Sequence, residues 1–335
     1  MKHLFIALFF AAATVSVGAQ SQSSPHETAY SFLRSGDYEN AILVLNKALE
    51  NDATNQQLLQ DLAMSYFMKK DFSKAKDVVT GLLDRDDADV VTYQIAGNVY
   101  RKLEEIKDAE KMYKKALKKF PNSGPLYNEF GELLQAKQDF PAAIKSWEKG
   151  IEMDPSYPGN YFNAASYYSN TNNKIWTIIY GEIFANMEHL TERGTAMKKI
   201  LLNAYKEKLF NKTDEGKDKS DFAKAVQETF DKQRPLIGKG LTPQTLTMIR
   251  TKFILDWFAK YGNKYPYKLF DYHQQMIKQG LFEAYNQWLF GSVDDLTAFD
   301  QWARTNSATY TKFDEFQKGR VFKMPQGQYY QLVQK

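Results

Sequence analysis

The chain has 335 residues, of which 43% are hydrophobic and 25% are charged, with a formal net charge of +4 at pH 7. This composition excludes an intrinsically disordered chain and an integral membrane protein, and the length allows about two domains of roughly 100 to 200 residues. The sequence has no cysteine, which excludes disulfides, thiolate chemistry and the lipid-accepting cysteine of a bacterial lipoprotein.

The first residues have the order of a secretory signal peptide. Met1-Lys2-His3 precedes an apolar run over residues 4–10, and small residues end the segment at Val17-Gly18-Ala19. The apolar run is shorter than the roughly 20 residues that a membrane-spanning helix needs. We therefore predict a signal peptide over residues 1–19. The mature protein is then exported, periplasmic or extracellular, not a lipoprotein, and without a membrane span.

A regular 34-residue period follows this segment. Alanine recurs at Ala41, Ala75, Ala109 and Ala143, and a small residue stands twelve positions earlier each time, at Ala29, Ala63, Gly97 and Gly131. A polar turn and a large apolar residue precede each of the four alanines, as in Gly36-Asp37-Tyr38. The small residues let paired helices approach closely while larger residues fill the space between neighbours, so the pattern predicts repeated helix-turn-helix units.

These residues resemble the tetratricopeptide repeat, whose 34-residue helix-turn-helix units stack into a superhelical solenoid. The resemblance implies a solenoid over residues 25–194, with four clear repeats that end near residues 55, 89, 123 and 157. A degenerate fifth repeat follows. In it Tyr161, Ala165 and Tyr168 keep the first-helix pattern, but Thr177 replaces the alanine and residues 173–190 read as a longer apolar helix.

Residues 195–335 lack the period and predict a separate helical domain. Amphipathic helices are expected over 196–210, 222–233, 243–261, 269–279 and 293–303, followed at 321–330 by a short hairpin or an extended tail. We expect most of the aromatic residues here to form the core, namely Trp257, Phe258, Tyr261, Tyr265, Tyr267, Phe270, Tyr272, Trp288, Phe290 and Trp302. The predicted fold class is all-α, a solenoid followed by a C-terminal helical domain.

The resemblance also implies a binding surface, because in this family the first helix of each repeat lines a concave groove for a partner's extended segment or helix. Carried over by register, the predicted partner-binding residues are Gln60, Met64 and Phe67 in repeat two, Gln94, Asn98 and Arg101 in repeat three, and Asn128, Glu132 and Gln135 in repeat four. Further groove positions are Met68, Lys102, Phe162, Ser166 and Ser169. We expect the polar side chains of Asn98, Arg101, Asn128 and Gln135 to be dispensable for packing.

The family's carboxylate clamp, which grips chaperone C-termini with Lys and Asn, is not matched. His26 and Tyr30 stand where its first Lys and Asn belong, and Asp61 replaces the next Asn. The resemblance therefore gives no support to chaperone-tail binding.

No motif predicts a catalytic residue, a metal or a cofactor. The histidines of the mature chain, His26, His189 and His273, lack metal-ligand spacing and are expected at surface or half-buried positions. The lysines of repeat three, Lys111, Lys114, Lys115, Lys118 and Lys119, indicate one solvated helix face in preference to a nucleic-acid patch.

The sequence thus favours an exported scaffold that binds a protein or peptide partner. Two alternatives remain open. Exposed clustered aromatic residues would favour a glycan-binding module. A deep pocket with strongly perturbed titratable groups in the C-terminal half would favour an enzyme.

Overall fold

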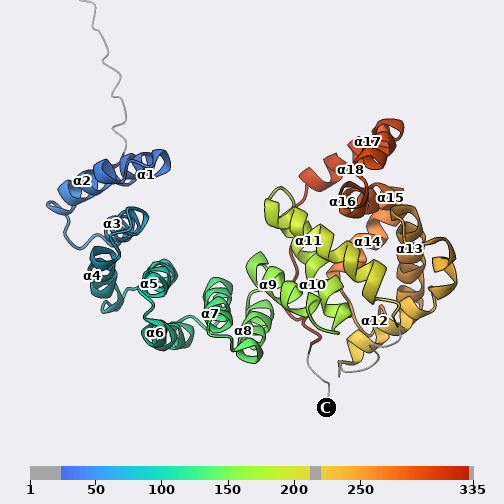
Figure 1. The fold of residues 1–335 in the computed structure, drawn as a ribbon, viewed down its shortest axis with the longest axis horizontal. Coiled ribbons are helices and arrows are strands. Elements are labelled where there is room, and N and C mark those ends of the chain that lie inside the picture. The colour runs from blue at the N-terminus through green and yellow to red at the C-terminus, as the bar shows by residue number, and fades with distance from the viewer. Residues whose placement is uncertain (1–23, 212–219, 332–335) are drawn as a thin grey trace, which may run out of the picture. The chain divides into compact units, whose positions relative to one another are not determined.

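The computed structural model describes residues 24–211 and 220–331, so the predicted signal peptide lies outside the described residues. Within these ranges every regular element is a helix and no strand occurs (Figure 1). The predicted all-α fold with repeated helix-turn-helix units is therefore confirmed. The chain divides into two compact units, residues 1–82 and 83–335. The predicted boundary between residues 194 and 195 stays a prediction.

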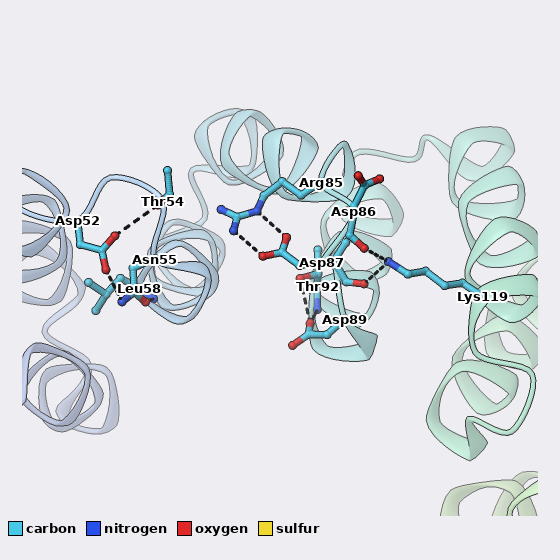
Figure 2. A network of polar contacts seen from close by, with 11 residues as sticks. Asp52, Thr54, Asn55, Leu58, Arg85, Asp86, Asp87, Asp89, Thr92 and Lys119 are labelled. Atoms are coloured by element: carbon cyan, nitrogen blue, oxygen red, sulfur yellow. Dashed lines mark hydrogen bonds and ion pairs between the residues drawn. The ribbon is translucent and has the colours of Figure 1, made fainter.

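The first unit contains two helix pairs. Its helices are α1 (Pro25–Ser35), α2 (Tyr38–Leu49), α3 (Gln56–Met68) and α4 (Phe72–Leu83). Ser24 and Glu27 form a reciprocal capping box at the start of α1, and Asn55 accepts a hydrogen bond from the Leu58 amide at the start of α3 (Figure 2). These caps satisfy amide groups that have no partner within the helix, so each helix has a defined first residue.

The second unit continues the repeats with three further pairs. These are α5 (Val90–Lys102) with α6 (Ile106–Lys119), α7 (Gly124–Ala136) with α8 (Phe140–Met153), and α9 (Pro158–Ser169) with α10 (Lys174–Met187). The first helices α3, α5, α7 and α9 begin at residues 56, 90, 124 and 158. These starts agree with the repeat ends predicted near residues 55, 89, 123 and 157. Asp89 caps α5 through the Thr92 amide at 2.9 Å (Figure 2).

The recurring small residues lie where helices cross. Ala41, Ala75, Ala109 and Ala143 all have 0% exposure. In the second unit a Cβ atom added to Gly97 would lie 1.7 Å from the Tyr113 hydroxyl oxygen, and one added to Gly131 would lie 2.2 Å from Trp147 Nε1. Glycine is required at these two positions because a large ring from the second helix of the same repeat covers the backbone.

We expect Ala109→Leu to destabilise the fold by about 1 to 3 kcal/mol, because a larger side chain forced into a close-packed crossing displaces its neighbours. Denaturant melts of the wild type and the variant measure this change. Asp108→Ala, at the exposed neighbouring position, is the matched control and should stay within about 0.5 kcal/mol. An unchanged midpoint in Ala109→Leu would mean that the crossing tolerates the extra volume.

The turns inside the repeats share one backbone conformation. Gly36, Lys70, Glu104 and Gln138 are spaced 34 residues apart and have φ angles of 79°, 68°, 59° and 63°. Only the first of them is glycine, the residue that adopts positive φ without a steric cost. The other three turns therefore hold a left-handed residue at some local expense, which the packing of the paired helices offsets.

A lysine connects the two ends of the third repeat. Lys119, the last residue of α6, donates hydrogen bonds to the main-chain oxygens of Asp86 (2.6 Å) and Ala88 (2.8 Å) in the segment before α5 (Figure 2). In the same segment Arg85 pairs with Asp87 at 2.7 Å. The Lys119 ammonium thus satisfies loop carbonyls and holds the start of α5 against the end of α6.

The remaining helices pack on the last two repeats. They are α11 (Glu192–Asn203) with a π-helical turn at Ala204–Lys208, α12 (Asp221–Asp231), a 3₁₀ turn at Arg234–Lys239, α13 (Pro243–Lys260), α14 (Lys268–Lys278), α15 (Phe282–Asn286) with a π-helical turn at Gln287–Gly291, α16 (Ser292–Asp294), α17 (Leu296–Thr305) and α18 (Ser307–Lys318). One hydrophobic cluster runs from Leu134 to Met324 and joins them to the repeats. Because the C-terminal helices cover it, α10 is buried on every side.

Several predictions for this half need correction. The helix expected over 196–210 begins at Glu192, and α15 and α18 were not predicted. Residues 320–331 form an extended tail that packs on the helices, and no hairpin occurs there. Of the ten aromatic residues expected in the core, seven are buried, while Phe258, Tyr261 and Trp302 are half-buried. The expectation that most of them are core residues is therefore correct.

Candidate functional site

Polar side chains from three successive first helices meet in the second unit. We call this surface the first-helix face and define it by Gln94, Asn98 and Arg101 of α5, Asn128, Glu129 and Glu132 of α7, and Asn163 of α9. The three residues of α5 are three or four positions apart, and on α7 Glu132 follows Glu129 by three positions and Asn128 by four, so on each helix they lie on one side.

The link between α5 and α7 is centred on Glu129. Gln94 Nε2 donates to Glu129 Oε1 at 2.7 Å, and the Tyr113 hydroxyl of α6 donates to Glu129 Oε2 at 2.9 Å. Burial raises the pKa of the Glu129 carboxyl, although both hydrogen bonds oppose that shift. Burial and the Glu129 charge likewise raise the pKa of Tyr113. The carboxylate is thus held in place from two helices.

Arg101 begins the second part of the face. Its guanidinium donates to Asn98 Oδ1 at 2.6 Å and to Glu132 Oε2 at 3.3 Å. The other oxygen of Glu132 accepts from Asn128 Nδ2 at 2.9 Å, and Asn163 Nδ2 donates to Asn128 Oδ1 at 2.9 Å. A continuous hydrogen-bond network therefore crosses from α5 through α7 to α9, with the donors and acceptors already oriented.

Five of the predicted binding residues belong to the first-helix face, four of them to this network and Gln94 to the Glu129 link, but their burial differs from what was expected. Asn128 is only 5% exposed, and its side chain donates to Glu132 and accepts from Asn163, each at 2.9 Å. The expectation that the polar groove residues are dispensable for packing is therefore wrong for Asn128. Arg101 and Gln135 are exposed, and Gln94, Asn98 and Glu132 are half-buried. The binding role of all these residues stays a prediction.

Glu129 and Asn163 belong to the face but were not predicted. Both lie 35 positions after a partner on the preceding first helix, since Gln94 contacts Glu129 and Asn128 contacts Asn163. In the first unit His26 contacts Asp61 at the same offset. A polar residue on one first helix therefore predicts a polar partner on the next first helix, at a distance of one repeat length plus one residue.

The fifth repeat extends the surface with an aromatic residue. The Arg193 guanidinium lies 5.2 Å from the ring centre of Phe162 and 5.6 Å from that of Phe184, while its Nε and Nη2 atoms bind both oxygens of Glu188. Phe162 is half-buried under this cation. The other two predicted positions, Ser166 and Ser169, are half-buried and bonded to each other through the Ser169 hydroxyl and the Ser166 carbonyl.

In the first unit the predicted positions carry a more apolar surface. Gln60 is buried, Met64 and Phe67 are half-buried, and Met68 is exposed. His26 Nδ1 lies 2.5 Å from Asp61 Oδ2, so the two residues at the clamp positions are bonded to each other. These positions therefore hold a bonded His–Asp pair where the family's carboxylate clamp has Lys and Asn.

Neither alternative function gains support from the described residues. None of the ten core aromatic residues named from the sequence is exposed, so they do not form an open stacking surface for sugars. The lysines of α6 are all exposed, and Lys114 pairs with Glu110, as expected for a solvated helix face. Among the parts of the chain that the structure describes, no group of three or more His, Cys, Asp or Glu side chains could hold a metal ion.

A buried ion cluster joins α10 of the fifth repeat to helices of the C-terminal half. Glu182 of α10 binds the Arg250 guanidinium, His273 Nε2 at 2.8 Å and the Tyr285 hydroxyl at 2.7 Å. Arg250 also binds Asn286, and the side chains of Glu182, Arg250 and His273 are 2 to 3% exposed. The expectation that His273 lies at or near the surface is wrong, because its ring joins this buried ion cluster.

Electrostatics within the buried ion cluster favour charged Glu182. Burial alone would raise the pKa of Glu182, but the Arg250 charge and the contacts from His273 and Tyr285 outweigh it and lower the pKa to about 2. Burial lowers the pKa of His273, and the Glu182 charge only partly opposes this. The cluster is thus a buried Arg250–Glu182 pair in contact with His273, and it holds α10 to α13, α14 and α15.

Comparisons with known proteins agree with this architecture. Two family models described as tetratricopeptide repeat match residues 32–95 and 96–161. The mitochondrial import receptor subunit TOM70 of Saccharomyces cerevisiae is 30% identical over 121 residues, which are 36% of this chain and 19% of that protein. The chain therefore spans about a fifth of the length of this curated relative.

Solved structures show likeness at low sequence identity. TTC0263, a thermophilic TPR protein of Thermus thermophilus, has a TM-score of 0.45 and 15% identity, covering 53% of this chain and 97% of its own. PilF of Pseudomonas aeruginosa has a TM-score of 0.47 and 16% identity, covering 54% and 82%. Within residues 24–211 and 220–331, no helix has the length and apolar character needed to cross a membrane.

Proposed function

Because this chain belongs to the tetratricopeptide-repeat family, we propose that it is an exported protein-interaction scaffold whose first-helix face holds an extended segment of a partner protein. Repeats of this family bind proteins or peptides. The export part of the proposal is supported by the signal-like order of residues 1–19. An intact-mass measurement on the exported protein should give a chain that begins at Gln20, and retention of Met1 would exclude cleavage.

The observation that carries the proposal is the continuous hydrogen-bond network of the first-helix face. It offers amide, carboxylate and guanidinium groups along three adjacent helices, which can bond to the main-chain groups of an extended peptide. Because the side chains are already held by one another, binding orders few of them and costs little conformational entropy. The half-buried Phe162 at the end of the face adds apolar contact area.

The position of the partner can be tested by site-specific photocrosslinking in the native envelope. A benzoylphenylalanine residue at exposed Gln135 of α7 should give a covalent adduct with the partner. The same residue at exposed Lys118 of α6 is the matched control and should give none. Adducts at Lys118 without adducts at Gln135 would exclude the first-helix face and revive the basic-face interpretation.

The partner segment found in this way allows a quantitative prediction. We expect Arg101→Ala to weaken its binding by about 10- to 100-fold, because a hydrogen bond to a charged group contributes roughly 1.5 to 3 kcal/mol. Calorimetric titration measures this loss. Stability should change by less than about 1 kcal/mol, since the Arg101 and Glu132 side chains are 40% and 36% exposed and water screens their attraction. The double variant Lys114→Ala/Lys118→Ala should bind like the wild type, and equal losses in both variants would contradict the proposal.

A further inference from the structure

The tail, residues 320–331, lies on the helices in the manner of a bound peptide. It follows α18 and has neither helix nor strand. Over residues 321–324 its side chains alternate, with Phe322 and Met324 buried while Val321 and Lys323 are exposed, and a turn at 326–327 follows. This alternation is typical of an extended chain with one side against a surface.

Three apolar anchors hold the tail. The Phe322 ring lies 5.2 Å from the Tyr272 ring of α14, and the Tyr330 ring stacks on Phe222 of α12 at a centroid distance of 4.9 Å. Met324 is 5% exposed and lines a small cavity with Ile151, Pro155 and Tyr161 of the fourth and fifth repeats. The tail therefore crosses from the C-terminal helices to the end of the repeats.

Polar contacts tie the tail to the ends of helices. Gln326 Nε2 donates to the main-chain oxygen of Met153 at 3.0 Å, at the last residue of α8. Gln328 Oε1 accepts from the main-chain amide of Lys268 at 2.6 Å, at the first residue of α14. The carbonyl and amide groups at helix ends have no partner inside the helix, so the tail supplies partners that a free peptide could supply equally well.

Three more hydrogen bonds fix the end of the tail. The Ser220 hydroxyl donates to the main-chain oxygen of Tyr330 at 2.6 Å, and Gln331 Nε2 donates to the Tyr168 hydroxyl oxygen at 2.8 Å. The Tyr330 hydroxyl donates to the main-chain oxygen of Pro266 at 2.9 Å. The surface thus binds both the side chains and the main chain of the tail.

We propose that the surface formed by α8, α9, α12 and α14 is a second peptide-binding site, which this chain's own tail occupies and which the tail of a second copy fills by exchange. The proposal does not depend on the first-helix face. Exchange of an identical terminal segment preserves every contact described above, so it links copies without creating a new interface. The attached tail has a high effective concentration, which keeps the site closed to dilute competitors.

The test uses the full chain with a protease site inserted between Gly319 and Arg320. A fluorescent peptide of residues 320–331 is added before and after cleavage, and its anisotropy is measured. The cleaved protein should bind the peptide at least about 100-fold more tightly than the uncleaved protein, because cleavage removes the advantage of the attached tail. A peptide with Phe322→Ala and Tyr330→Ala should bind at least about tenfold more weakly, since two aromatic anchors are lost.

Circular dichroism after cleavage shows whether the protein is still folded, which separates lack of binding from unfolding. Cleaved protein that stays helical but does not bind the peptide would overturn the proposal, as would equal binding of the two peptides. If cleavage causes loss of helicity, the uncut variant Phe322→Ala/Tyr330→Ala replaces the cleaved protein. Its tail is held more weakly, so the added wild-type peptide should displace it and bind. If that variant is folded and binds no peptide, or is itself unfolded, the tail is an integral part of the core and the proposal fails.

Discussion

Replacing Arg250 with alanine should cost about 3 to 5 kcal/mol of unfolding free energy, which is the loss expected when one partner of a buried ion pair is removed. The Glu182 carboxylate would keep its contacts with His273 and Tyr285 but lose the only cation that binds it directly within the described residues. A buried charge without a counter-charge is strongly destabilising. Urea denaturation followed by circular dichroism measures the change.

Two further variants separate charge from packing. Lys260 pairs with Glu228 where both side chains are about half exposed, so Lys260→Ala should change stability by no more than about 1 kcal/mol. The double variant Glu182→Leu/Arg250→Met removes both charges and should recover part of the loss seen in Arg250→Ala. A double variant that is as unstable as the sum of its two single changes would show that the pair contributes through packing alone.

Acid should destabilise the protein through the same buried ion cluster. The folded pKa values of Glu182 and His273 are both lowered, so the unfolded chain binds protons first as the pH falls. The contribution of His273 is lost below its unfolded value near 6.5. That of Glu182 is complete above pH 4.5 and is lost as the pH approaches about 2. The shift of Glu182 corresponds to a loss on the order of 3 kcal/mol.

Comparison with Glu182→Gln isolates this contribution from the surface carboxylates, which titrate in the same range. The stability difference between the wild type and Glu182→Gln should be largest between pH 5 and 7 and should narrow as the pH falls toward 2. Urea midpoints measured at half-unit pH steps would show the narrowing. Two parallel pH profiles would mean that Glu182 has an ordinary pKa in the folded protein.

The repeats were predictable from sequence because their geometry leaves a periodic trace. A residue at a helix crossing is limited in size, as Ala109 and Gly131 show, and the stack repeats the same crossing every 34 residues. The sizes of the two residues that face each other at a helix crossing could also have been predicted. Glycine at Gly131 accompanies Trp147, sixteen residues later, whereas alanine at Ala63 accompanies the smaller Val79.

The candidate site and the C-terminal half were less predictable. Register identified Asn98 and Arg101, but the partners Glu129 and Asn163 come from neighbouring helices, and their pairing depends on how adjacent repeats are offset. The buried ion cluster joins Glu182 to Arg250 and His273 across 68 and 91 positions, a separation that leaves no local pattern. Without a period, an amphipathic helix shows which side is buried but gives no information about its neighbour.

The internal pairing of the first-helix face has a consequence for the heat of binding. A partner that docks there exchanges existing hydrogen bonds, such as Asn128 to Glu132, for new ones of similar strength, so the net enthalpy per bond is small. Little apolar surface is covered apart from Phe162, and the heat-capacity change should therefore be small as well. A small enthalpy together with a small heat-capacity change is therefore the calorimetric signature expected for binding at this face.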